Sequence, residues 1–287
     1  EQKKCSASIE SDLFWATCGG MGLTGLIQDV TLQLKKIVSP LVQNISIRAR
    51  DLNEIMNLFE ERYSWTYSMA WIDCLANGKH TGRSIFMAGE HSTEMDTTQR
   101  SIVKKPLLTI PFFFPSFILN STSASLFNTF YYNVKRESKT ASLSHYDGFF
   151  YPLDFVSDWN KVYSKRGFIQ YQFVIPIAAG REGLNKILST INASGFGVYL
   201  AVLKLFGEAT GLMSFPMKGY TLALDIPIKK GLFTFLDELD KMVADYGGRI
   251  YLSKDARMSK EIFWATYPNA SRFKELLIKY DPENRFV

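Results

Sequence analysis

Three glycines in the stretch GMGLTG, residues 20–25, have the G-x-G-x-x-G spacing of a dinucleotide-binding loop. That chemistry requires a helix directly after the glycines, whose N-terminus meets the pyrophosphate, and an acidic residue about 20 positions later for the ribose. Here the next stretch, LIQDVTLQLKKI, alternates apolar and polar residues and predicts a strand, and the ribose position falls near Asn44. The sequence therefore argues against a Rossmann domain and predicts a tight turn where the backbone passes close to a flat group.

Polar side chains that could bind or catalyse recur in the C-terminal half. Gln170 and Gln172 share one face of the predicted strand IQYQFVIP, and Lys204 interrupts the apolar row of the predicted strand GVYLAVLKLFG. Lys254, in YLSKDAR, follows the end of a third predicted strand. From these residues alone two interpretations stay open: a solvated face with exposed or snorkelling lysines, or a polar site for a ligand.

Composition limits the possible partners and metals. The 33 basic and 28 acidic residues are spread along the 287-residue chain, so the net charge of +5 marks no nucleic-acid footprint but suits an anionic substrate or membrane head groups. Cys5, Cys18 and Cys74 lie far apart, and the three histidines form no ligand pair, so we expect neither a structural disulfide nor a metal site.

The most apolar run, IPFFFPSFIL at 110–119, is about half the ~20 residues that a membrane-spanning helix needs, and it contains two prolines. We expect no transmembrane segment. The first residues lack the pattern of a signal peptide, which favours a location in the cytoplasm or at the periphery of the inner membrane.

The periodicity predicts an α+β fold. DLNEIMNLFEERY reads as a helix with Asp51 as its N-cap, SWTYSMAWID as a strand, and FNTFYYNVK as a short strand. From residue 168 the order is β-α-β-β-α-β, which predicts an antiparallel sheet with helices packed on one face. This half is the larger part of a domain that we expect to span residues 38–248.

Longer motifs carry a family resemblance. FWATCGGMGLTGLI, YSMAWID, YPLDFVSDWNKVY, GFIQYQFVIP, VLKLFG, SFP, YTLALDIPIK, ELDKMVADYGGRIYLSKDAR and DPENRF resemble, in order and spacing, motifs of the decaprenylphosphoryl-β-D-ribose 2-oxidases. These are FAD-linked oxidases of the vanillyl-alcohol-oxidase type. The resemblance runs from about residue 11 to the end of the chain.

The resemblance implies an enzyme that oxidises the ribose 2-hydroxyl of a polyprenyl-phosphoryl sugar to a ketone, with hydride passing to FAD. It also implies an NAD(P)-dependent keto-reductase as partner, which makes the arabinose epimer for cell-wall synthesis. No nucleic acid is expected, and at most peripheral membrane contact. The alternatives are an oxidase of a soluble sugar or aldonolactone, or a non-catalytic substrate-binding module.

The same resemblance implies roles for individual residues. Lys254 and Gln172 are expected in catalysis, the lysine stabilising negative charge on the reduced flavin or holding the reacting hydroxyl. The residues expected to bind substrate are Lys204, Gln170, Trp71, Asp154, Val202, Phe206, Thr221 and Ala223. Those expected to contact FAD are Gly22, Gly25, Leu26, Ile27 and Tyr251.

Three positions depart from the best-known family members. Ala223 stands where they carry a cysteine attacked by covalent inhibitors, Thr221 replaces an asparagine, and Phe150 replaces a tyrosine. These changes alter pocket polarity rather than hydride transfer.

The resemblance also divides the chain. Residues 1–37 correspond to the last part of an FAD-binding domain, and residues 249–287 to a segment that returns to pack on it. The rest of that FAD domain has no counterpart here, so we expect this chain alone to hold FAD weakly and to be inactive. The aromatic stretch at 110–127 falls where the family has loops over the active site, and reads either as a lid packed on the core or as a landing site for a polyprenyl tail.

Overall fold

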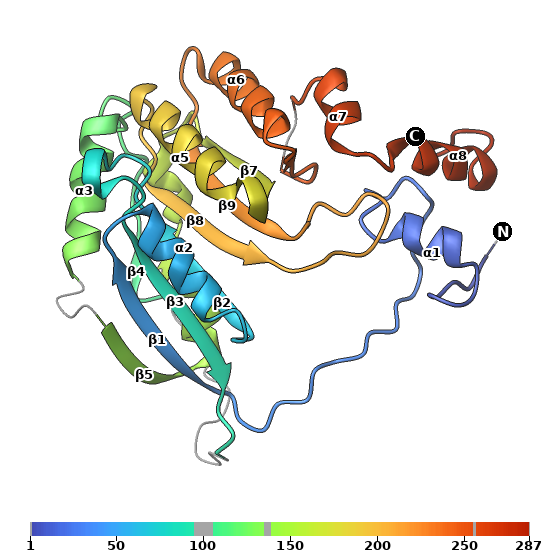
Figure 1. Cartoon of the computed structure of the whole chain (residues 1–287), viewed down its shortest axis with the longest axis horizontal. Coiled ribbons are helices and arrows are strands. Elements are labelled where there is room, and N and C mark those ends of the chain that lie inside the picture. The colour runs from blue at the N-terminus through green and yellow to red at the C-terminus, as the bar shows by residue number, and fades with distance from the viewer. Residues whose placement is uncertain (1, 95–105, 135–138, 255–256, 287) are drawn as a thin grey trace.

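The computed structural model describes residues 2–94, 106–134, 139–254 and 257–286. Its centre is an eight-stranded sheet whose neighbouring strands all pair antiparallel (Figure 1). The strands in spatial order are β10 (Arg249–Ile250), β7 (Phe168–Pro176), β9 (Gly219–Pro227), β8 (Leu200–Phe206), β2 (Tyr67–Ile72), β3 (Ser84–His91), β1 (Leu41–Ala49) and β5 (Lys139–His145). Two short strands, β4 (Leu108–Thr109) and β6 (Val156–Ser157), pair in parallel beside it.

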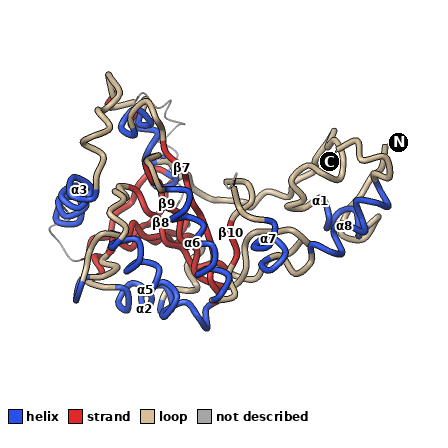
Figure 2. The backbone as a smooth tube through the Cα atoms, turned by 90° about the horizontal axis from the view of Figure 1, so that it is seen from above, coloured by secondary structure: helices blue, strands red, loops and turns tan. Residues whose placement is uncertain are grey.

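Three amphipathic helices cover one face of the sheet: α2 (Leu52–Glu61), α5 (Ile177–Ala193) and α6 (Leu232–Asp245) (Figure 2). Their apolar stripes pack on alternate strand residues such as Phe173 and Leu222, both fully buried. The predicted α+β fold, its β-α-β-β-α-β order and the helix that begins after Asp51 are confirmed. The Asp51 carboxylate accepts the Glu54 backbone N–H at 2.9 Å.

Helix α3 (Ser121–Val134) corrects the strand predicted at FNTFYYNVK. Aromatic and asparagine residues suit a strand in isolation, but Asn120 accepts the backbone N–H of Ser123 at 3.0 Å and so starts a helix. Ala124 and Asn128, one turn apart, are then buried. Tertiary contacts on this helical face outweigh the local β preference.

The stretch LIQDVTLQLKKI also differs from its prediction. It is extended but forms no strand within the described residues, and Leu26, Leu32 and Leu34 are each at least 73% exposed. A period of two permits a strand, but a strand exists only where a neighbouring backbone completes the ladder. The glycines still do not begin a Rossmann domain, since no helix comes directly after Gly25 and the next element is β1.

The two ends of the chain pack together, away from the large sheet. Helix α1 (Ser11–Thr17) lies beside α8 (Ala270–Tyr280), and α7 (Lys260–Thr266) connects them to the sheet (Figure 1). Ala16 and Phe273 belong to a second, smaller apolar cluster between them. The remaining short helices are η1 (Gly78–His80), α4 (Tyr146–Phe150), η2 (Pro152–Phe155) and η3 (Trp159–Tyr163). Within the described ranges, no helix is long and apolar enough to cross a bilayer.

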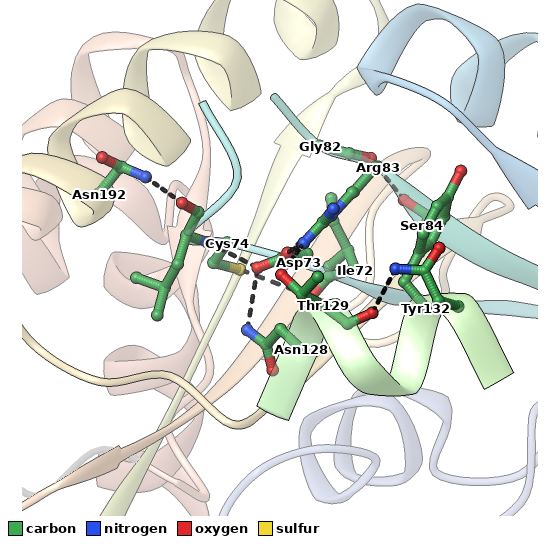
Figure 3. A network of polar contacts seen from close by, with 12 residues as sticks. Ile72, Asp73, Cys74, Gly82, Arg83, Ser84, Asn128, Thr129, Tyr132 and Asn192 are labelled. Atoms are coloured by element: carbon green, nitrogen blue, oxygen red, sulfur yellow. Dashed lines mark hydrogen bonds and ion pairs between the residues drawn. The ribbon is translucent and has the colours of Figure 1, made fainter. Parts of the chain in front are cut away.

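A buried ion pair fastens α3 to the sheet (Figure 3). Asp73 is fully buried and pairs with Arg83 at 2.7 Å, while its second oxygen accepts Asn128 Nδ2 at 2.9 Å. The Arg83 guanidinium also donates to Thr129 at 2.7 Å and lies over the ring of Tyr132. One carboxylate therefore holds both the β2–β3 connection and α3.

We predict that Asp73→Ala lowers the free energy of unfolding by about 3 kcal/mol, because it leaves the partly buried Arg83 charge and the Asn128 amide without their acceptor. Urea unfolding followed by tryptophan fluorescence measures the loss. The control is Arg50→Ala, which removes a pair with Glu54 whose arginine is 79% exposed, and should leave stability close to that of the wild type. Equal effects of the two variants would contradict the role of Asp73.

Candidate functional site

The face of the sheet opposite α2, α5 and α6 carries a row of the predicted residues. Strand register aligns Gln172 with Ala223, Ala223 with Val202, and Val202 with Trp71. On one side of this row Lys204 pairs with Thr221, and on the other side Gln170 pairs with Asp225. Because alternate strand residues share a face, the register alone brings most of the predicted substrate-binding residues together.

Asp225, on one side of this row, is a further candidate that the sequence motifs did not indicate. It is 1% exposed, and Gln170 Nε2 donates to its Oδ1 at 2.8 Å. Its Oδ2 is buried and has no hydrogen-bond partner among the described residues. Burial raises its pKa to about 6, against the opposing effects of Gln170 and the Lys254 charge. The signal was available, since Asp225 follows Thr221 and Ala223 on one strand face.

The charge of Lys254 reaches this carboxyl group, and Lys204 lies farther along the same sheet face. Lys254 lies in the turn after β10, where its backbone N–H donates to the Tyr251 carbonyl at 3.0 Å. Partial burial lowers its pKa and the nearby charge of Lys204 adds to that effect, whereas Asp225 acts in the opposite direction. Neither lysine forms an ion pair at salt-bridge distance in the part of the chain that the structure describes, so both amino groups can meet an anionic ligand. Lys204 also borders a depression of about 330 Å³ lined by Tyr63 and Trp65.

Gln172 is held in place from two directions. Its side-chain amide donates to Thr221 Oγ1 at 3.1 Å, and the Thr221 hydroxyl donates in turn to the Phe173 carbonyl at 2.8 Å. Its backbone carbonyl accepts the N–H of Tyr251 at 2.9 Å. This links the strand that carries both glutamines to the segment that carries Lys254.

One contact links the glycine turn to the segment that carries Tyr251 and Lys254. The turn at 20–25 comes near it through Ser253, whose hydroxyl donates to the Met21 sulfur at 3.5 Å. Gly22 and Gly25 have φ values of +79° and +140°, and a Cβ built on either would meet no atom within 4 Å. Leu26 and Ile27 are 80% and 57% exposed. The Tyr251 ring stacks on Phe215 at 4.4 Å.

These features fit a large, flat cofactor with a polar edge. The glycine turn leaves open space, exposed apolar side chains and a stacked ring border it, and a partly desolvated lysine stands at its polar end. Gly22, Gly25, Leu26, Ile27 and Tyr251 would hold such a group.

The remaining predicted residues divide into two sets. Trp71 is 4% exposed because Tyr131 of α3 packs against it at 4.8 Å, and Phe206 packs on Phe215 at 6.2 Å. Both residues lie on the same sheet face, because Trp71 pairs with Val202 and Phe206 is four residues after Val202 on β8. Asp154 lies exposed in η2, outside the row defined by strand register, and Phe150 lies against Tyr67 at 4.8 Å.

Comparison with known proteins gives two kinds of likeness. No protein-family model matches the chain. In sequence, it is 33% identical to decaprenylphosphoryl-β-D-ribose oxidase of Mycolicibacterium smegmatis over 98% of its own length and 63% of that protein. It is 29% identical to an uncharacterised protein of Streptomyces coelicolor, covering 96% of this chain and 78% of that one. The chain thus spans less than two thirds of the first of these relatives.

Solved structures match in fold. Xylooligosaccharide oxidase of Myceliophthora thermophila has a TM-score of 0.60 at 12% identity, covering 99% of this chain and 61% of that one. Glucooligosaccharide oxidase of Acremonium strictum has a TM-score of 0.57 at 11% identity, covering 98% and 60%. At such identities these likenesses show the fold alone.

We predict that Asp225 makes folding stability fall as pH rises. Its folded pKa of about 6 exceeds the ordinary value of 3.8, so the folded state binds the proton more tightly and loses this advantage between those values. The stability of Asp225→Asn relative to the wild type should therefore increase by roughly 1 kcal/mol between about pH 5 and about pH 7. Urea unfolding at both pH values measures this, with Glu238→Gln on the exposed face of α6 as the control for loss of one charge. A difference that does not grow with pH would contradict the raised pKa.

Proposed function

This chain is a homologue of decaprenylphosphoryl-β-D-ribose oxidase and has the fold of FAD-linked sugar oxidases, and on this premise we propose that, together with an FAD-binding domain that completes the cofactor site, it oxidises a sugar hydroxyl to a ketone. The proposed substrate is a polyprenyl-phosphoryl-ribose that reacts at its 2-hydroxyl. The observation that carries the proposal is the buried Oδ2 of Asp225, which has no hydrogen-bond partner among the described residues, beside Gln170 and within reach of the Lys254 charge.

Asp225 is proposed as the proton acceptor of the reaction. Oxidation of a secondary alcohol removes the hydroxyl proton and transfers the hydrogen on carbon as hydride, and FAD supplies the hydride acceptor when it is bound. The O–H bond breaks toward Asp225 Oδ2, while the electrons of the C–H bond leave with the hydride and the carbonyl forms. Gln170 holds Oδ1 at 2.8 Å, so that Oδ2 is directed at the substrate.

The two lysines are proposed to balance two different negative charges, one on the cofactor and one on the substrate. Lys254, next to the residues proposed to hold FAD, stabilises the negative charge that the reduced flavin acquires. Lys204 is exposed and lies two strands away from Gln172, where it pairs with the anionic phosphate of the substrate. Gln172, fixed by Thr221, orients the sugar.

We also propose two partners, an FAD-binding domain and a reductase. Residues 1–37 and 249–287, which pack together through α1 and α8, are proposed to contact an FAD-binding domain. The ketone product is proposed to pass to an NAD(P)-dependent reductase, and the two steps together yield the arabinose epimer used in cell-wall precursors.

In the FAD-loaded protein, Asp225→Asn is expected to slow flavin reduction by about 100-fold or more, because general-base catalysis contributes on that order. In the wild type the rate should rise with pH through about 6 as Asp225 loses its proton, whereas the variant should lack this limb. Stopped-flow measurement of flavin absorbance at several pH values tests both. Asp158→Asn, in an exposed pair with Lys161, is the control. An unchanged rate in Asp225→Asn would remove this residue from the mechanism.

Lys254→Ala should abolish flavin reduction by a polyprenyl-phosphoryl sugar. The control variant Lys260→Ala, at the exposed start of α7, should stay fully active. The physical reason is the loss of the cation beside the reduced flavin. Single-turnover reduction with the lipid-linked ribose, with free ribose and with a xylooligosaccharide measures both the role and the substrate class. Normal reduction of Lys254→Ala would eliminate the role, and faster reduction by a free sugar would replace the lipid-linked substrate with a soluble one.

A further inference from the structure

Helix α3 turns its apolar side toward solvent. Leu126, Phe130 and Val134 follow one another at intervals of four residues and are 69%, 69% and 56% exposed. The face that packs on the protein includes buried Ala124 and Asn128, and Asn128 donates to Asp73 and to the Val198 carbonyl. The helix contains no charged residue. A surface helix normally has the opposite orientation, so this stripe suits an apolar environment outside the protein.

The chain just before α3 extends the same surface. Phe112, Phe113 and Phe117 are 62%, 42% and 78% exposed, while Leu119 is buried and anchors the segment. Exposure on this scale argues against the interpretation of these aromatics as a lid packed on the core. In Figures 1 and 2, α3 stands at one side of the molecule, far from α1 and α8.

Three cations gather at the end of this apolar surface. Arg166, Lys229 and Lys230 line a depression of about 380 Å³ together with Phe117 and Leu119. None of the three forms a salt bridge with the described residues. They extend from the end of η3 and from the turn after β9, so the fold brings them together from distant parts of the sequence. No acidic residue lines the depression.

We propose that this surface docks the protein on an anionic membrane. The aromatic and aliphatic side chains of 112–118 and α3 insert at the boundary between head groups and acyl chains, while Arg166, Lys229 and Lys230 contact lipid phosphates. The positive charge of this surface favours an anionic membrane over a second copy of the chain. A second copy of the chain on a symmetric interface would bring the same three cations together, which like-charge repulsion opposes.

The docking surface is connected to the candidate site by aromatic side chains. Phe127 of α3 packs against Tyr199 at 6.1 Å, and Tyr199 against Tyr163 at 6.3 Å. Tyr163 in turn stacks on Phe168 at 4.3 Å, at the start of the strand that carries Gln170, and the charge of Asp225 reaches Tyr163. Docking would therefore bring the site close to the lipid surface. If the substrate is the polyprenyl-phosphoryl-ribose of the proposed function, docking also brings the site to the bilayer in which that lipid resides.

Flotation with vesicles tests the proposal. The protein is mixed with vesicles of phosphatidylcholine alone or with added phosphatidylglycerol, neither containing a sugar lipid, so the result is independent of the proposed oxidation. We expect binding that depends on the anionic lipid and weakens as salt increases. Arg166→Gln/Lys229→Gln/Lys230→Gln should reduce partitioning at least about tenfold, and Phe117→Ser/Phe130→Ser by a similar factor.

The control variants lie on α8, at the other end of the molecule. Lys274→Gln/Lys279→Gln and Ile278→Ser, the last at a position 60% exposed, should bind as the wild type does, and thermal unfolding confirms that every variant is folded. No binding to anionic vesicles, or equal loss in the α8 variants, would overturn the proposal. Self-association lost in Phe117→Ser/Phe130→Ser, without vesicle binding, would assign the surface to a second copy instead.

Discussion

The antiparallel pairing of β7, β9, β8 and β2 is the constraint on which the rest of the molecule depends. Burial of alternate residues under α2, α5 and α6 sets the register, because a shift by one residue would expose the apolar side chains of every strand. The same register decides what lies on the opposite face. Packing on one side of the sheet thus positions Gln170, Asp225 and Lys204 on the other.

On that opposite face, burial shifts the pKa values of two charged groups, and their mutual attraction opposes the shift of each. Burial favours the neutral form of Asp225, whereas the nearby Lys254 favours its ionised form. Burial and Lys204 together favour the neutral form of Lys254. A carboxyl group with a pKa of about 6 beside a partly buried lysine is an arrangement typical of functional sites rather than of exposed surface pairs.

Helix α3 contacts the candidate site with one face and exposes an apolar stripe to solvent with the other. Asp73 holds the polar face through Asn128, and Tyr131 covers Trp71 at the edge of the site. Thr122, Thr129 and Asn133 are exposed as well, but Leu126, Phe130 and Val134 form an apolar stripe on the outer face. The contact between Asp73 and Asn128 orients the helix so that this stripe faces outward.

The sequence by itself determined the α+β class, the β-α-β-β-α-β order, the helix after Asp51 and the shared face of Gln170 and Gln172, since these follow from local periodicity. Its motifs also identified the relatives. The tertiary structure decided the rest. Asp225 becomes distinctive only when β7 and the turn after β10 surround it, because a pKa depends on neighbours distant in sequence. Likewise, FNTFYYNVK became a helix and LIQDVTLQLKKI remained unpaired, because burial and strand partners come from other parts of the fold.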